Sequence, residues 1–121
     1  MKSSNPKKQI KWHHTKPLHA SHKDFAAHLS KEMRAQFKRR SIEVRKGDTV
    51  RVMRGDSKVN GKQGKVSSIM RAKKMVLVEG IISKKTDGTE RLIPLRPSNL
   101  LVIALDEKDS RRFGKAKKGE K

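Results

Sequence analysis

The sequence lacks several kinds of residue, and each absence excludes a class of protein or site. It has no cysteine, so disulfides and thiolate metal sites are excluded, and a reducing interior suits the chain. No apolar run approaches the roughly 20 residues that a membrane-spanning helix requires, so we expect no membrane span. Aromatic residues are scarce as well, because tyrosine is absent and only one Trp and three Phe occur.

Acidic residues are few relative to basic ones. The 121-residue chain has 12 Asp and Glu against 32 Lys and Arg, which gives a formal net charge of +20. Solubility alone needs far less charge than this. The density of cations indicates a polyanionic partner, and nucleic acid is favoured over an anionic membrane because the apolar runs are short.

Charged and apolar residues are distributed differently along the chain. Residues 1–41 hold 11 basic and 2 acidic residues (+9), residues 42–104 hold 14 and 6 (+8), and residues 105–121 hold 7 and 4 (+3). Apolar residues gather in the middle segment. We therefore predict a basic N-terminal extension over 1–41, a globular domain over 42–104 and a charged C-terminal tail over 105–121.

The middle segment is organised around the stretch from Lys46 to Val66. After the Gly47-Asp48 turn, Val50 and Val52 alternate with polar neighbours, which is the period of a half-buried strand. A basic loop with several glycines follows, and a second apolar strand begins after it. This arrangement resembles the KOW motif, a strand-loop-strand unit whose central glycine corresponds to Gly64.

Short apolar segments recur at even spacing through the rest of this domain, as they do in small all-β barrels and sandwiches. A domain of about 63 residues favours a curled, closed barrel over an open sheet with bare edges. Asp87-Gly88, between two of the segments, is a strong hairpin signal. We therefore predict a mainly β fold, a small SH3-like KOW barrel with an N-terminal basic arm, one α-helix and a charged C-terminal tail. The predicted strands are Thr49–Met53, Lys65–Met70, Met75–Glu79, Gly80–Lys84, Glu90–Leu95 and Leu100–Ala104.

The first 16 residues show no periodicity and contain five lysines. We predict an extended basic arm that gains order from a partner. Trp12 is its one large aromatic side chain, and two roles stay open for it. It can anchor the arm on a base, a sugar or a groove of the partner, or it can pack against the chain's own domain.

A helix is predicted over about 22–37. Ser21 and Asp24 form a capping pattern at its start, and apolar residues then recur at helical spacing. The apolar stripe is expected to pack against the strands, while the basic face is either solvated or in contact with the polyanion. The run Lys38-Arg39-Arg40 favours contact. The apolar stripe consists of Phe25, Leu29 and Met33.

No catalytic or metal-binding constellation is visible. The five histidines all lie between residues 13 and 28, without cysteines and with few carboxylates nearby, so neither a metal nor another cofactor is expected. Contacts of these histidines to phosphate and sugar are the better interpretation. The chain lacks a nucleophile with an adjacent base and a GxxxxGK-type phosphate loop, so we do not expect an enzyme.

With these parts in view, the chain resembles the KOW-bearing large-subunit ribosomal proteins of type twenty-four, in their archaeal and eukaryotic form. The resemblance covers nearly everything from Lys7 to about Arg112. Two departures are visible: the loop over 56–64 is longer than is usual, and Glu43 stands where a proline is common. The pieces that carry the resemblance are Lys7-Lys8-Gln9, Pro17-Leu18-His19, Ala27-His28-Leu29-Ser30, Arg39-Arg40-Ser41-Ile42, Val44-Arg45-Lys46-Gly47-Asp48, Val50-Arg51-Val52-Met53-Arg54-Gly55, Gly64-Lys65-Val66, Val78-Glu79-Gly80, Lys84-Lys85, Asp87-Gly88-Thr89-Glu90 and Pro97-Ser98-Asn99-Leu100.

The resemblance implies a structural constituent of the large ribosomal subunit. Such a protein binds ribosomal RNA in the 5′ region of the large-subunit RNA, acts early in subunit assembly and lies near the peptide exit tunnel of a cytoplasmic ribosome. Neighbouring large-subunit proteins are then further partners, and targeting factors or the nascent chain are candidates at the tunnel exit. The alternative is a KOW-type transcription elongation factor, which usually adds a polymerase-gripping domain that is not visible in the segments described above.

The predicted barrel has no Phe, Trp or Tyr, so we expect it to recognise the shape and phosphates of folded RNA rather than to stack on bases. The turn Arg96-Pro97-Ser98-Asn99 can be explained by its structure alone, and the resemblance adds it to the RNA-binding surface. The residues expected to bind RNA are Lys7, Lys8, Lys11, Trp12, His13, His14, Lys16, His19, Lys23, Arg34, Lys38, Arg39, Arg40, Arg45, Lys46, Arg51, Arg54, Gly55, Lys58, Lys62, Gly64, Lys65, Lys84, Lys85, Arg96, Ser98 and Asn99.

Overall fold

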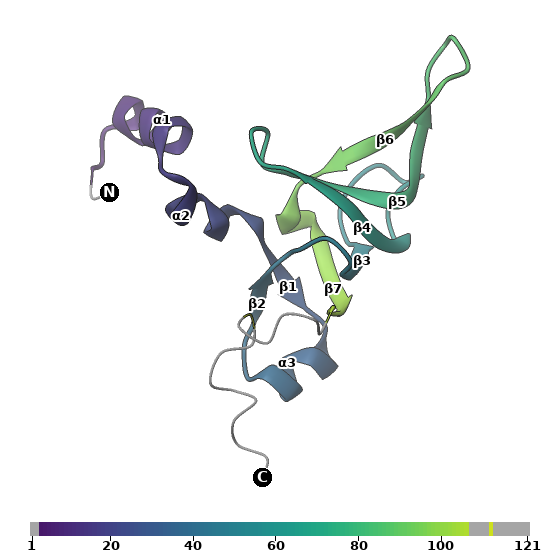
Figure 1. Cartoon of the computed structure of the whole chain (residues 1–121), viewed down its shortest axis with the longest axis horizontal. Coiled ribbons are helices and arrows are strands. Elements are labelled where there is room, and N and C mark those ends of the chain that lie inside the picture. Colours follow the sequence, from purple (N-terminus) through teal and green to yellow (C-terminus); the bar gives the residue numbers. More distant parts are fainter. Residues whose placement is uncertain (1–2, 107–111, 113–121) are drawn as a thin grey trace.

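The fold is described from a computed structural model that defines residues 3–106 and 112. Helices at the N-terminal end project to one side of a twisted sheet (Figure 1). None of the helices in this described part has the length and apolar character to cross a membrane. The helical elements are α1 (Pro6–Thr15), α2 (Leu18–Ser21), the 3-10 helix η1 (His22–Phe25), α3 (Lys31–Phe37) and the 3-10 helix η2 (Pro97–Asn99). The strands are β1 (Ala26–Leu29), β2 (Ser41–Glu43), β3 (Thr49–Val52), β4 (Gln63–Met70), β5 (Met75–Lys84), β6 (Glu90–Leu95) and β7 (Leu100–Ala104).

The strands form a seven-stranded sheet in the order β2-β1-β7-β3-β4-β5-β6. All neighbours are antiparallel except β1 and β7, which run parallel with His28 opposite Leu101. β4 pairs with β3 through its first half and with β5 through its second, and the register shifts between Val66 and Ser68. Such an irregularity bends a strand, so β4 turns the chain from one half of the sheet to the other.

The mainly β prediction is confirmed, but the closed barrel is not. In the described part of the chain, β2 and β6 form the two ends of the hydrogen-bonded order and do not pair with each other. The sheet is therefore curled and open by this criterion. Of the two edge strands, β2 has only three residues and β6 contains Pro94, and both features keep edge strands from pairing with other chains.

The core lies where the two halves of the sheet face each other. Val50 and Val52 of β3 are 0% and 1% exposed, while Arg51 between them is exposed, as alternation along a strand requires. Leu29 of β1 is also 0% exposed and joins the same cluster. Burial of one such aliphatic side chain contributes about 1.5–3 kcal/mol. The sheet and its core therefore include a strand from the segment assigned to the N-terminal extension.

The helix predicted over about 22–37 is wrong in its first half. Residues 22–25 form η1 and residues 26–29 form β1, and only α3 is an α-helix in this range. The apolar residues that suggested a helical stripe also satisfy a strand, because Ala27 and Leu29 alternate with exposed His28 and are buried.

The cap of the real helix is Ser30 rather than Ser21. The Ser30 hydroxyl accepts a hydrogen bond from the Met33 amide at 3.3 Å, which starts α3. The helix ends at Lys38, whose φ of 50° is left-handed, as is common at helix C-termini.

The extended arm predicted for the first 16 residues is likewise wrong, because Pro6–Thr15 form α1. Asn5 caps this helix by accepting a hydrogen bond from the Lys7 amide at 3.0 Å, and Pro6 occupies the first helical turn. An asparagine followed by proline is a helix-start signal that the absence of apolar periodicity obscured. No residue of α1 is buried.

The strand predictions over 49–104 agree well with the structure. β3, β4, β6 and β7 match their predicted ranges within two residues at the boundaries, while Met75–Glu79 and Gly80–Lys84 are one continuous strand, β5. The predicted hairpin is confirmed. Gly88 has a φ of 81° and its amide donates to the Lys85 carbonyl at 3.0 Å, while the Lys85 amide donates to Thr89 at 3.0 Å.

A buried ion pair holds the start of β3. Asp48 is fully buried and accepts hydrogen bonds from Arg112 Nη1 at 2.6 Å and Nη2 at 2.5 Å, and from the amides of Arg45 at 2.8 Å and Asp106 at 3.1 Å. This bidentate pairing compensates the desolvation of both charges. Arg112 thereby contacts the start of β3, and its Nη2 also donates to the Glu43 carbonyl of β2 at 2.6 Å. Most of the predicted charged tail over 105–121 lies outside the described residues.

Candidate nucleic-acid interface

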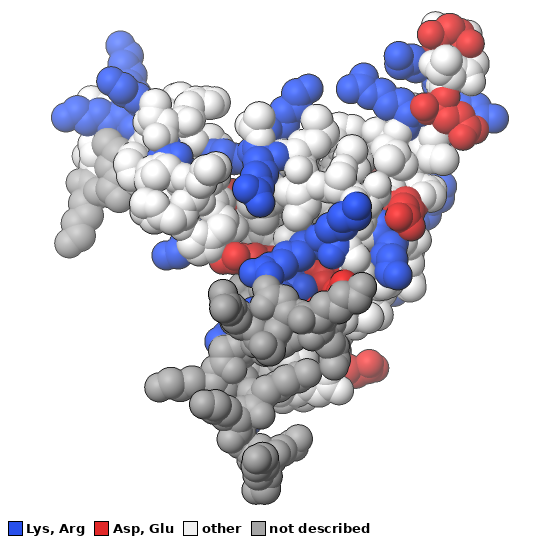
Figure 2. Space-filling model, viewed as in Figure 1, with Lys and Arg blue, Asp and Glu red and all other residues white. Residues whose placement is uncertain are grey.

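The most exposed basic element is α1. Lys7, Lys8 and Lys11 are exposed there, and none of them has an ion-pair partner in the described part of the chain. Figure 2 shows Lys and Arg on this projecting helix, across the middle of the same face and at the tip of the β5–β6 hairpin, where acidic side chains also occur. Among the charged side chains visible on this face (Figure 2), Lys and Arg exceed Asp and Glu.

Asp24 and Lys74 together connect α1 to the sheet. Asp24 in η1 lies 2.5 Å from Lys16 Nζ and 3.1 Å from Lys74 Nζ, and Lys74 also donates to the His13 carbonyl at 2.5 Å. Lys74 sits in the turn between β4 and β5 with a left-handed φ of 54°. The three side chains are only 11–21% exposed. Asp24 thus fixes the end of α1 against the sheet.

Burial and the neighbouring charges shift the pKa values of Asp24 and His13 at this junction. Burial by itself raises the pKa of Asp24, but hydrogen bonds from Lys16 and Lys74 and the charges of both ammonium groups outweigh it, so the pKa is lowered. The pKa of His13 is lowered by burial and by the nearby Lys74 charge. The lowered pKa favours the neutral form of the His13 imidazole.

Several residues predicted to bind RNA have partners within the chain. Arg34 donates from Nε to the Leu29 carbonyl at 2.8 Å, and Lys16 is held by Asp24. Lys84 lies 3.8 Å from Glu90, although both remain exposed. The predicted residues that are exposed are Lys7, Lys8, Lys11, Trp12, His13, His14, His19, Lys23, Lys38, Arg39, Arg40, Arg45, Lys46, Arg51, Arg54, Gly55, Lys58, Lys62, Lys65, Lys84, Lys85, Arg96 and Ser98.

Gly64 lies inside β4 opposite Val50, not in a turn. A Cβ on Gly64 would lie 2.3 Å from the Glu79 carbonyl oxygen and 2.8 Å from Val78 Cγ1. The glycine therefore permits the close approach of β5.

The predicted turn at 96–99 is the helix η2 and the residues that flank it. Its Asn99 carbonyl accepts the Met53 amide at 2.8 Å, so this main-chain group joins η2 to the loop after β3. Arg96 and Ser98 are exposed beside it, while Pro97 is buried. The segment combines a structural anchor with a polar surface.

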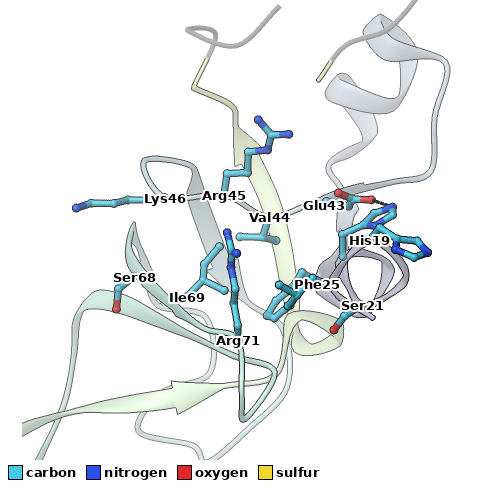
Figure 3. A pocket seen from close by; sticks show the side chains of 12 residues that line it. His19, Ser21, Phe25, Glu43, Val44, Arg45, Lys46, Ser68, Ile69 and Arg71 are labelled. Atoms are coloured by element: carbon cyan, nitrogen blue, oxygen red, sulfur yellow. Dashed lines mark ion pairs between the residues drawn. The ribbon is translucent and has the colours of Figure 1, made fainter. Parts of the chain in front are cut away.

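The structure also brings together residues that the sequence did not connect. A groove of about 770 Å³ lies between the α2–η1 segment, the β2–β3 connection and the end of β4 (Figure 3). Leu18, Phe25 and Ile69 line it. Three of the predicted RNA-binding residues also line it, namely His19, Arg45 and Lys46. Arg71, which the charge pattern did not single out, extends alongside Ile69 toward Arg45 (Figure 3). No local pattern indicates this groove because its walls are far apart in sequence.

The described part of the chain has no group of three or more His, Cys, Asp or Glu residues that could hold a metal. His22 Nε2 instead pairs with Glu43 Oε1 at 3.1 Å across one end of the groove. The imidazole and carboxylate are both partly exposed. The described part of the site therefore combines a basic surface with an apolar groove.

Comparison with known proteins agrees with this interpretation. The family of the eukaryotic ribosomal proteins L26 and their archaeal counterparts matches residues 3–117. The chain belongs to this ribosomal protein family. It is also 42% identical over 110 residues to the large ribosomal subunit protein uL24 of Methanosphaera stadtmanae, with 91% of this chain and 92% of the relative covered.

Family membership confirms the resemblance seen in the sequence, and it classifies the chain with ribosomal proteins rather than with enzymes. The structure gives this chain an exposed basic helix, α1, and exposed Lys and Arg side chains in its loops. Several acids are engaged within the chain: Asp24 and Asp48 pair with Lys and Arg side chains, and Glu43 lies 3.1 Å from His22 Nε2.

Proposed function

We propose that the chain is a structural constituent of the large ribosomal subunit and binds ribosomal RNA through its exposed Lys and Arg side chains. The observation that supports this most directly is the contrast between bases and acids. Lys7, Lys8 and Lys11 are exposed and unpaired within the described part of the chain, whereas Asp24 and Asp48 are neutralised internally. The outward field of the protein is therefore positive, as phosphate binding requires.

The finer assignment follows the resemblance and the name of the archaeal relative, a large-subunit protein. Under this proposal the chain binds the 5′ region of the large-subunit RNA early in assembly and lies near the peptide exit tunnel of a cytoplasmic ribosome. Neighbouring ribosomal proteins are its other partners, and targeting factors or the nascent chain meet the same surface.

This surface makes two kinds of contact with RNA. Lys and Arg of α1, of the β3–β4 loop and of the β5–β6 hairpin bind phosphates and set the position of the protein. Polar and main-chain groups near η2 and the glycine-containing loops approach sugar and backbone. Folded RNA is recognised in this way by shape and by phosphate contacts rather than by a base code.

Cosedimentation tests the proposal. Tagged protein expressed at native level should migrate with the large subunit and its precursors, and purified protein should bind a 5′ fragment of large-subunit RNA more tightly than a 3′ fragment of equal length. Copurification with RNA polymerase and absence from ribosomal fractions would contradict the proposal and favour a transcription elongation factor.

A further inference from the structure

The groove between α2–η1 and the sheet has an apolar floor. Phe25 and Val44 are buried at its base, and Ile69 packs partly buried against the same core. Its volume of about 770 Å³ lies within the roughly 300–1,000 Å³ of typical ligand pockets. Leu18 stands at its edge and is 71% exposed. A large apolar side chain beside an apolar floor forms a patch that a partner can cover.

The rim of the groove is cationic. Lys46 and Arg71 are exposed there, and the Arg71 guanidinium has no hydrogen bond or ion pair within residues 3–106 and 112. The one carboxylate among the lining residues, Glu43, is engaged by His22 at 3.1 Å. The groove therefore suits a ligand that combines a flat apolar part with an anionic group.

We propose that this groove holds one unstacked nucleotide of the bound RNA. Its base lies against Leu18, Phe25 and Ile69, and its phosphate is held by Arg71 and Lys46. The inference rests on the RNA binding proposed above and adds a base contact to it. RNA loops and bulges present splayed bases, and each carries an adjacent phosphate, which matches the apolar floor and the cationic rim.

Paired variants test this on the full chain with a 5′ fragment of large-subunit RNA. Leu18→Ser should weaken binding about tenfold without changing the salt dependence, because it removes apolar contact and no charge. Ile82→Ser is the matched control, since Ile82 is 44% exposed on β5 outside the groove, and it should bind like the wild type. Melting curves check that both variants are folded.

Charge variants make the complementary measurement. Arg71→Gln should lower the affinity and reduce the slope of log affinity against log salt by roughly 0.7 to 0.9, the effect of one lost phosphate contact. Lys31→Gln removes the same charge from α3, which contributes no residue to the groove, and should change the slope less.

The outcomes separate this inference from the broader function. If the wild type binds and Leu18→Ser binds equally well, the nucleotide site is refuted while RNA binding stands. If the wild type does not bind the RNA, both proposals fail. A benzophenone amino acid at position 18 in assembled large subunits should cross-link to RNA. A cross-link to a neighbouring protein, or within the chain, would contradict the proposal that a nucleotide occupies the groove.

Discussion

Asp24→Asn should weaken RNA binding even though it removes a negative charge. Electrostatics alone predicts tighter binding when a protein of net charge +20 loses an acid. The structure predicts the opposite, because Asp24 holds both Lys16 and Lys74 and thereby fixes α1 against the sheet. The sign of the change decides between the two accounts.

The magnitude follows from the two ion pairs. The three side chains are partly buried, so each pair contributes about 0.5 to 1 kcal/mol, toward the upper end of the range for surface pairs. Loss of both ion pairs weakens the docking of α1 by about 1 to 2 kcal/mol. In the variant, this amount is subtracted from the free energy of RNA binding, because α1 must become ordered when it binds. The affinity should therefore fall about 5- to 30-fold.

The control is Asp87→Asn at the hairpin tip. Asp87 is exposed, and asparagine before Gly88 preserves the hairpin turn. This variant should bind RNA as well as the wild type or slightly better. If Asp24→Asn binds as tightly as Asp87→Asn, α1 is not positioned by Asp24 and the reasoning is refuted.

Trp12 makes the docking of α1 directly visible, because it is the chain's one tryptophan and no tyrosine is present. Time-resolved anisotropy should show a larger nanosecond component in Asp24→Asn. Since the pKa of Asp24 is lowered in the folded chain, the docking energy is complete above the ordinary pKa of 3.8 and is lost as pH falls through the lower folded pKa. Wild-type anisotropy should stay constant from about pH 7 to 5 and fall only in acid. The Asn variant should lack this transition.

Three further changes have defined outcomes. Gly64→Ala places a Cβ against the Glu79 carbonyl, so the free energy of unfolding should fall by about 1 to 3 kcal/mol in urea titrations; unchanged stability would mean that β5 can move aside. Arg112→Ala leaves Asp48 buried without its cation and should cost about 3 to 5 kcal/mol in the same assay, whereas a small loss would show that water replaces the guanidinium. Deletion of residues 1–16 removes three exposed lysines of α1 and should reduce the salt slope of RNA binding by about 2 to 3; equal slopes would mean that these charges stay solvated.

The strands between residues 49 and 104 could be predicted because their signals are local. Val50 and Val52 alternate with polar residues, and Gly88 marks the one hairpin whose turn was predicted to need a positive φ. The helix over 22–37 could not be predicted in the same way. Apolar spacing there is compatible with a strand and a helix, and the pairing of β1 with β7, some 70 residues later in the chain, decides between them.

The candidate site likewise has features that could be predicted from local signals and features that could not. The exposure of lysines such as Lys7 and Lys8 could be predicted from their charge alone, because long cationic side chains are rarely buried. The role of Asp24 and the groove around Phe25 could not be predicted, because each depends on segments that only the fold brings together. The sequence shows that residues 42–104 contain no aromatic side chain. In the fold, however, Phe25, which precedes this segment, lines the groove together with residues of the segment.

Ultraviolet cross-linking of the tagged chain in growing cells, followed by sequencing of the attached RNA, tests the central claim most directly. The account predicts that most cross-links fall in the 5′ region of the large-subunit ribosomal RNA and that peptide mapping places them on α1, the β3–β4 loop and the β5–β6 hairpin. Cross-links spread over nascent messenger transcripts, with ribosomal RNA at background level, would contradict it.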